Sequence, residues 1–120
     1  MSKTITISDK SFELIKDQLE TPTNKEGLEY CIIRCDRAGV FAGYVDEEKG
    51  QECVVYEARR LWYWNGAAST SQLAVDGVNK PDDCKFPVAL KKIKLKDVIE
   101  ITPTTSKAQK SIANVKTWEV

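Results

Sequence analysis

The sequence predicts an α+β fold, either a twisted antiparallel sheet or a small open barrel, with two or three short helices. Apolar segments over residues 28–64 are joined by short links, which favours an antiparallel meander. A lysine-rich segment around residue 94 alternates with apolar residues, as a half-exposed strand does. Hydroxyl residues precede two short segments that are compatible with helices. At 120 residues, the chain has the size of a single domain.

The first 27 residues are predicted to be an appendage of this domain. Residues 4–7 alternate like a short strand, and Ser8 can cap a helix over residues 9–20. Residues 28–120 then form the sheet core, together with a C-terminal helix.

The meander is predicted from three segments. Residues 28–36 and 40–46 are the first two strands, and Gly43 inside the second predicts a bulge or a close backbone neighbour. Residues 53–56 lead into a third strand, which continues through the aromatic run as far as Trp64.

A short helix is predicted after the aromatic run. Ser69 or Thr70 can begin it, and the helix extends through Val75. Gly77 stands where a left-handed C-terminal cap is needed.

The last elements are two extended segments and a helix. Residues 92–96 form a strand with a solvated lysine face, and residues 98–101 continue in extended form until Pro103. Thr104 or Thr105 then caps the C-terminal helix.

The formal net charge is zero, but the charges are unevenly distributed. Residues 1–57 hold seven Lys/Arg and twelve Asp/Glu, whereas residues 58–120 hold eleven and six, so the two halves carry −5 and +5. A neutral total argues against binding of duplex nucleic acid through its phosphates. A local anion site in the second half remains compatible with these charges. The chain has no apolar run of the ~20 residues that a membrane helix needs, and its start does not resemble a secretory signal, so we expect a cytosolic protein.

The chain has four cysteines and no histidine. The absence of histidine removes the commonest general base and the commonest metal ligand. Cys31 and Cys35 could suggest half of a zinc site, but on a strand they would lie about 13 Å apart, too far to share an ion. We therefore expect buried thiols in a reducing compartment, with no metal and no cofactor. No catalytic motif is visible, so we expect a binding protein and not an enzyme.

The stretch from residue 58 to residue 73 is the best candidate site. On a strand, Arg60, Trp62 and Trp64 would share one face and Arg59 the other, and the sequence does not decide which face is buried. A face that combines cations with rings suits the recognition of phosphates and bases. The hydroxyls that follow stand at a helix start, where anions are favoured. The candidate ligand-binding residues are Arg59, Arg60, Trp62, Trp64, Asn65, Gly66, Ser69, Thr70, Ser71, Phe41 and Lys107.

Each of these residues also has a purely structural interpretation. Hydroxyls before a helix commonly act only as caps. Large aromatics are often core residues, and we expect at least one of Trp62 and Trp64 to be in the core. Phe41 can be a stacking platform, although a hairpin core residue is the commoner case. Lys107 could reach a phosphate across a dimer.

Two runs resemble a family of small bacteriophage proteins. They are RCDRAGVFAGY at residues 34–44 and ARRLWYWNGA at residues 58–67, and IEITPT at residues 99–104 resembles the family's closing strand. The likeness covers about residues 28–118. Within this group the chain is similar to the Thoeris anti-defence sponge proteins, which sequester cyclic ADP-ribose isomers made by host immune enzymes without cleaving them.

This resemblance implies a phage protein that sequesters a cyclic nucleotide signal in the bacterial cytoplasm, as a dimer or a larger assembly. It places Arg59 or Arg60 on phosphate and an aromatic residue, either Trp62 or Phe41, on adenine. The family's Thr-Tyr-Ser is Cys-Asp-Arg here, at residues 35–37. Two alternatives remain open at this point: an accessory phage protein that contacts a host or virion protein through the aromatic strand, and a binder of single-stranded nucleic acid.

Overall fold

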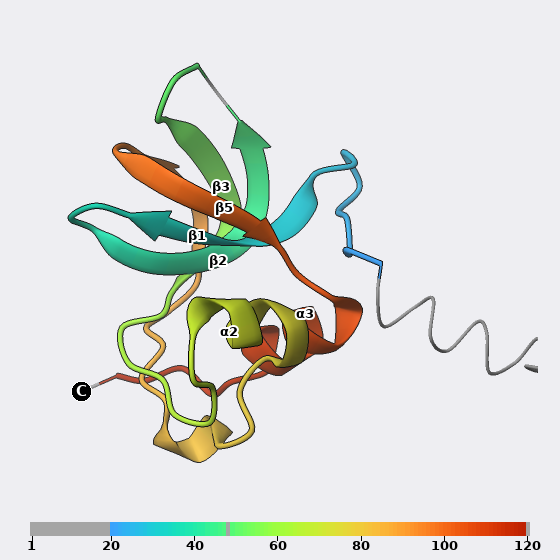
Figure 1. Ribbon diagram of the computed structural model, residues 1–120, viewed down its shortest axis with the longest axis vertical. Coiled ribbons are helices and arrows are strands. Elements are labelled where there is room, and N and C mark those ends of the chain that lie inside the picture. The colour runs from blue at the N-terminus through green and yellow to red at the C-terminus, as the bar shows by residue number, and fades with distance from the viewer. Residues whose placement is uncertain (1–19, 48, 120) are drawn as a thin grey trace, which may run out of the picture.

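The computed structural model describes residues 20–47 and 49–119 and confirms the α+β class (Figure 1). The described strands are β1 (Glu29–Cys35), β2 (Gly39–Glu47), β3 (Cys53–Arg60), β4 (Leu90–Leu95) and β5 (Val98–Pro103). The described helices are α2 (Thr70–Asp76), the 3-10 helix η1 (Pro81–Asp83) and α3 (Ser106–Ala113). The strand and helix predicted over residues 4–20 lie outside the described residues, apart from Glu20.

The five strands form one antiparallel sheet in the order β4-β3-β2-β1-β5. The consecutive strands β4 and β5 therefore lie on opposite edges, although only Lys96 and Asp97 join them. Three Cα–Cα steps reach at most about 11 Å, whereas five strands in a flat sheet span about 19 Å. The sheet must curl until the ends of its two edge strands meet, as in a small open barrel. The link is fixed there because Asp97 O accepts a hydrogen bond from Asp36 N, at 3.0 Å.

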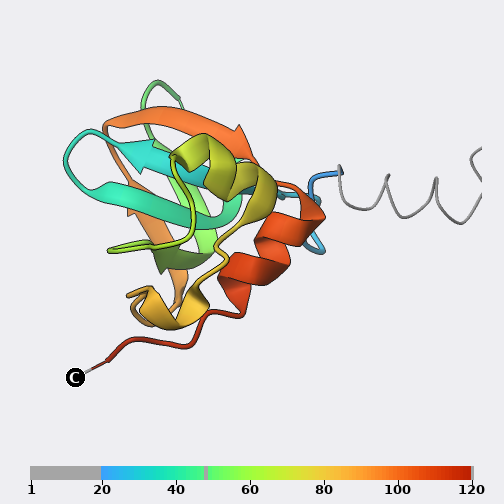
Figure 2. The ribbon, with the colours of Figure 1, turned by 60° about the horizontal axis from the view of Figure 1, so that its bottom comes forward.

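Strand alternation divides the apolar side chains between two cores. One core fills the inside of the curled sheet and includes Ile33, Phe41 and Val55. The other lies between the outer face of the sheet and the helices, and it includes Ile32 and Phe86. Helices α2 and α3 lie together on one side of the sheet (Figures 1 and 2). The curled sheet is thus packed on both faces.

The bulge predicted at Gly43 is confirmed. The pairing of β2 with β3 shifts register between Ala42 and Tyr44. A Cβ atom on Gly43 would collide with the Val55 side chain and would lie 2.8 Å from Tyr56 O. Glycine is needed here because the neighbouring backbone approaches too closely for any side chain.

The predicted helix caps are also confirmed. Ser69 caps α2 because its side chain accepts a hydrogen bond from Gln72 N at 3.1 Å. Gly77 ends α2 with a φ of 74°, and its N–H donates to Leu73 O. Thr105, one of the two candidates, caps α3 by accepting from Ala108 N at 3.0 Å.

The predicted extent of the third strand is wrong. β3 ends at Arg60, four residues before Trp64: Leu61 N still donates to Val40 O, but the chain then leaves β2. The next residues make only an isolated bridge between Tyr63 and Lys85. Among the residues described, no helix is both long enough and apolar enough to cross a membrane.

Candidate functional site

A basic cleft of about 400 Å³ opens where the curled sheet closes on itself. It combines the turn between β1 and β2, the start of β2, the end of β3, and β4 with the link to β5. Its lining residues are Arg37, Ala38, Phe41, Arg60, Ile93, Lys94, Leu95, Lys96 and Asp97. The lining residues include four cationic side chains and one carboxylate, a formal charge of +3. A cleft with a cationic rim and apolar side chains beneath it can hold a compact anion that also carries an apolar surface.

The pair of Arg60 and Phe41 lies at the centre of this cleft. The two residues are register partners on β3 and β2, and the Arg60 guanidinium lies over the Phe41 ring, with Cζ 4.5 Å from the ring centroid. One guanidinium nitrogen donates to Ala38 O at 2.9 Å. Phe41 is only 1% exposed, whereas Arg60 is partly exposed. The ring therefore supports the guanidinium from below, and the cation faces the cleft.

Arg59 points to the other face of β3 and is used by the fold. It is 5% exposed, and its guanidinium donates to Ile112 O at 3.1 Å and to Phe86 O, Pro87 O and Ala113 O at 3.4 Å. Two of these acceptors, Ile112 O and Ala113 O, lie at the C-terminal end of α3, where a cation is favoured. Burial lowers the pKa of the guanidinium, an effect that the Tyr30 hydroxyl partly opposes. In this structure, Arg59 lies outside the basic cleft.

Trp62 and Trp64 lie in different surroundings. Trp64 is partly buried and packs against the helix-side core without being one of its buried residues, so the expectation that at least one of the two lies in the core is not met. Trp62 is 59% exposed and stacks on Trp118, with ring centroids 5.2 Å apart and planes at 3°. The Lys85 ammonium lies 5.5 to 6.0 Å from the centroids of Trp62, Tyr63 and Trp118. We call these four residues the aromatic patch.

The turn after Trp64 forms a third location, separate from the basic cleft. Gly66 has a φ of 92°, and a Cβ there would collide with the Asn79 side chain. Ser69 is engaged as the cap of α2, and Thr70 and Ser71 begin that helix. Lys107 pairs with Asp76 at 3.5 Å. A cavity of about 300 Å³ joins Gly66 to Lys107, and its lining combines the Lys107–Asp76 pair with Gln72, Gly77, Val78, Asn79 and Ser111.

The candidate residues therefore do not form one site. Arg60 and Phe41 meet in the basic cleft, whereas Trp62 lies on the aromatic patch. Arg59 and Trp64 pack against the helix-side layer, and the remaining candidates follow the turn and the helix starts: Asn65, Gly66, Ser69, Thr70, Ser71 and Lys107. The cleft cations Arg37, Lys94 and Lys96 were not among the candidates. No local sequence pattern predicts that these residues line one cleft, because the segments that carry them come together only when the sheet closes.

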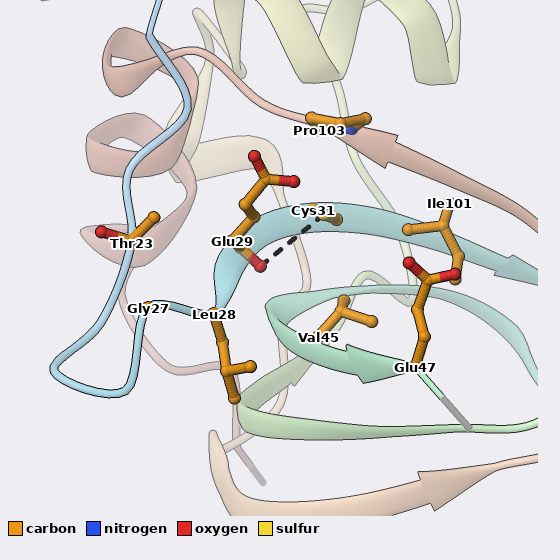
Figure 3. Close-up of a pocket in the computed structure, with 9 residues that line it drawn as sticks. All are labelled: Thr23, Gly27, Leu28, Glu29, Cys31, Val45, Glu47, Ile101 and Pro103. Carbon is orange, nitrogen blue, oxygen red and sulfur yellow. Dashed lines mark hydrogen bonds between the residues drawn. The ribbon is translucent and has the colours of Figure 1, made fainter.

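An acidic pocket of about 450 Å³ lies at the opposite end of β1 and β2 (Figure 3). Cys31 lies between Glu29 and Glu47 there, and its Sγ donates to Glu29 O at 3.6 Å. Burial, with the two carboxylates adding to it, raises the pKa of the Cys31 thiol to about 12. The thiol stays protonated at neutral pH, and it is therefore a poor nucleophile. Across residues 20–47 and 49–119, no cluster of three His, Cys, Asp or Glu side chains could hold a metal ion.

These features define a small α+β domain whose curled sheet carries a cationic cleft. The chain belongs to the family described as a domain of unknown function, DUF6948, which matches residues 28–112. No curated protein and no solved structure matches the chain.

Proposed function

We propose that this protein binds a small cyclic nucleotide in the basic cleft and sequesters it without cleaving it. The observation that carries the proposal is the Arg60 guanidinium, held over the Phe41 ring in a cleft whose lining residues also include Arg37, Lys94 and Lys96. The cleft volume of about 400 Å³ falls in the range of small-molecule sites.

The chemistry of the cleft matches this class of ligand. A cyclic nucleotide is a compact anion with flat rings, so it needs cations for its phosphates and planar or apolar groups for its bases. Arginine serves phosphates well because its guanidinium donates two parallel hydrogen bonds. Sequestration requires affinity alone, and the buried Cys31 thiol is protonated at neutral pH. We therefore propose a binding protein and not an enzyme.

The resemblance to phage sponge proteins supplies the biological context of the proposal. The ligand would be an immune signal, such as a cyclic ADP-ribose isomer or a cyclic oligonucleotide, made in an infected bacterial cell. The protein would then act in the host cytoplasm, as a dimer or a larger assembly. Light scattering on the purified protein, with and without ligand, measures the assembly state directly.

The experiment is a thermal-shift screen of the purified chain against cyclic ADP-ribose isomers and cyclic di- and trinucleotides. At a ligand concentration one hundred times Kd, binding adds about 2.7 kcal/mol of stability, which raises Tm by several degrees for a domain of this size. Arg60→Ala is expected to abolish the shift. Arg34→Ala is the matched control, because Arg34 is exposed and pairs with Glu100 on the sheet, outside the cleft.

The state of the recovered ligand completes this test. Intact nucleotide recovered after denaturing the protein supports sequestration, whereas a cleaved product would make the protein an enzyme. If no member of the panel shifts Tm, the proposal is wrong for these ligands.

The aromatic patch favours a second candidate function, the docking of a host or virion protein. Stacked, exposed tryptophans are typical of the residues that contribute most to protein interfaces. On this alternative, Trp62→Ala weakens partner binding and Arg60→Ala does not. Binding to single-stranded nucleic acid would instead show an affinity that falls steeply with salt.

A further inference from the structure

The two residues at the centre of the basic cleft do not have the roles that their side-chain types first indicate. An aromatic ring is the usual platform for a base, and an arginine is the usual partner of a phosphate. Phe41, however, is 1% exposed, and the Arg60 guanidinium lies over its ring. A ligand that enters the cleft meets the guanidinium, not the ring.

We infer that Arg60 is the stacking surface for the ligand's base, and that Phe41 positions Arg60 without touching the ligand. This inference rests on the proposed function and assigns roles within the same cleft. A guanidinium is planar and delocalised, so it can stack on a ring at each of its two faces. The base would then complete a sandwich of base, Arg60 and Phe41.

The guanidinium is already fixed in the position that stacking requires. Phe41 supports it at 4.5 Å, and Ala38 O accepts one of its hydrogen bonds at 2.9 Å. A long side chain that is ordered before binding loses less conformational entropy when the ligand arrives. Because Ala38 belongs to the turn between β1 and β2, that turn sets the position of the platform.

The phosphates are then left to the other cations of the cleft. Arg37 comes from the turn between β1 and β2, and Lys96 from the link between β4 and β5. Asp97 is the one carboxylate in the lining and disfavours anions at its own end. The cleft should therefore select a ligand that carries both a flat base and an anionic group, in preference to a phosphate without a base.

The substitution Arg60→Lys tests this inference, because it keeps the positive charge and removes the plane. Cyclic di-adenosine monophosphate is the probe with bases, and inorganic pyrophosphate is the probe without them. We expect Arg60→Lys to weaken binding of the dinucleotide by about 10- to 100-fold, as is typical when a stacking partner is lost. Pyrophosphate binding should change by no more than about 3-fold, because the net charge is unchanged.

Phe41→Leu provides the second test, since it keeps the core apolar while removing the ring beneath Arg60. The measured quantity is the ratio of the two affinities, which a general loosening of the fold would leave unchanged. We expect the preference for the dinucleotide over pyrophosphate to fall, together with the ultraviolet hypochromism of the bound adenine. Circular dichroism checks that each variant is folded.

The outcomes separate this inference from the proposed function. If Arg60→Lys binds the dinucleotide as tightly as the wild-type protein does, Arg60 is a point charge and the inference is wrong, while the proposed function stands. If the wild-type protein binds pyrophosphate as tightly as it binds the dinucleotide, stacking contributes nothing and the inference is again wrong. If the wild-type protein binds neither this probe nor any ligand of the thermal-shift panel, the proposed function fails, and the inference fails with it.

Discussion

The neighbouring residues Arg59 and Arg60 should respond to alanine substitution in opposite ways. Arg59→Ala removes a buried guanidinium that donates to four backbone carbonyls, of which those of Ile112 and Phe86 are in buried hydrogen bonds. Phe86 O also accepts from Trp118 N, and Ile112 O from Val115 N, so both carbonyls keep a donor and the cost is the loss of hydrogen bonds to a charged group, about 1.5–3 kcal/mol each. The two buried bonds give a loss of about 3–6 kcal/mol, a large part of the 5–15 kcal/mol that typically stabilises a domain.

Arg60→Ala should have a much smaller effect on stability. Its hydrogen bond to Ala38 O is exposed, and its contact with Phe41 is a partly exposed cation–π pair. Together these contacts are worth about 1 kcal/mol. Arg60→Ala should nevertheless abolish ligand binding, whereas any Arg59→Ala protein that stays folded should still bind the ligand, although more weakly than the wild-type protein does.

Urea unfolding measured by circular dichroism distinguishes the two substitutions. With a typical slope of about 2 kcal/mol per molar urea, Arg59→Ala should lower the midpoint by about 1.5–3 M, and Arg60→Ala by about 0.5 M. Arg59→Lys serves as a further comparison, because one ammonium cannot reach all four carbonyls and should restore only part of the loss. The reasoning would be refuted if Arg59→Ala unfolded at the same urea concentration as Arg60→Ala while failing to bind the ligand.

Two further predictions concern the inside of the curled sheet. The raised pKa of Cys31, about 12 in place of 9.0, stabilises the folded state fully below about pH 9, and this contribution is lost as the pH rises towards the folded pKa. Between about pH 9 and pH 10.5, the free energy of unfolding should therefore fall more steeply for the wild-type protein than for Cys31→Ala, by up to 1.4 kcal/mol per pH unit; equal slopes in urea titrations would contradict this. Gly43→Ala should cost about 1–3 kcal/mol through overpacking against Tyr56 O. Gly50→Ala is the comparison, because a Cβ at Gly50 would meet no other atom and only the positive φ of 66° disfavours a side chain there. This substitution should cost about 1 kcal/mol in the same urea assay.

The elements predicted correctly from the sequence are those specified by neighbouring residues. Ser69 and Thr105 act as caps because their side-chain oxygens reach an N–H three residues ahead, which is a local relation. Gly77 ends a helix and Gly43 marks a bulge for equally local reasons. The end of β3 at Arg60 was predicted wrongly because the chain leaves β2 there and Tyr63 bridges to Lys85, more than twenty residues away in the chain.

The candidate site could be predicted only in part, for the same reason. Strand alternation placed Arg59 and Arg60 on opposite faces, but the identity of the buried one depends on the carbonyls of α3, more than fifty residues away. The stacking of Trp62 on Trp118 likewise joins distant segments, which meet because Trp118 N donates to Phe86 O. The basic cleft could not be predicted from neighbouring residues, because its lining forms only when the whole sheet has closed.

The buried arginine also explains why its neighbour can serve as a rigid platform. The last residues of a strand fray easily unless side chains hold them, and β3 ends at Arg60. Arg59 fastens this end to the carbonyls of α3 on one face, and the pairing of Arg60 with Phe41 holds it against β2 on the other. Helix α3 lies outside the basic cleft, yet it fixes the strand that carries the Arg60 guanidinium. Loosening the Arg59 contacts without unfolding the domain should therefore weaken ligand binding through Arg60, and the partly anchored Arg59→Lys protein is the variant in which to measure it.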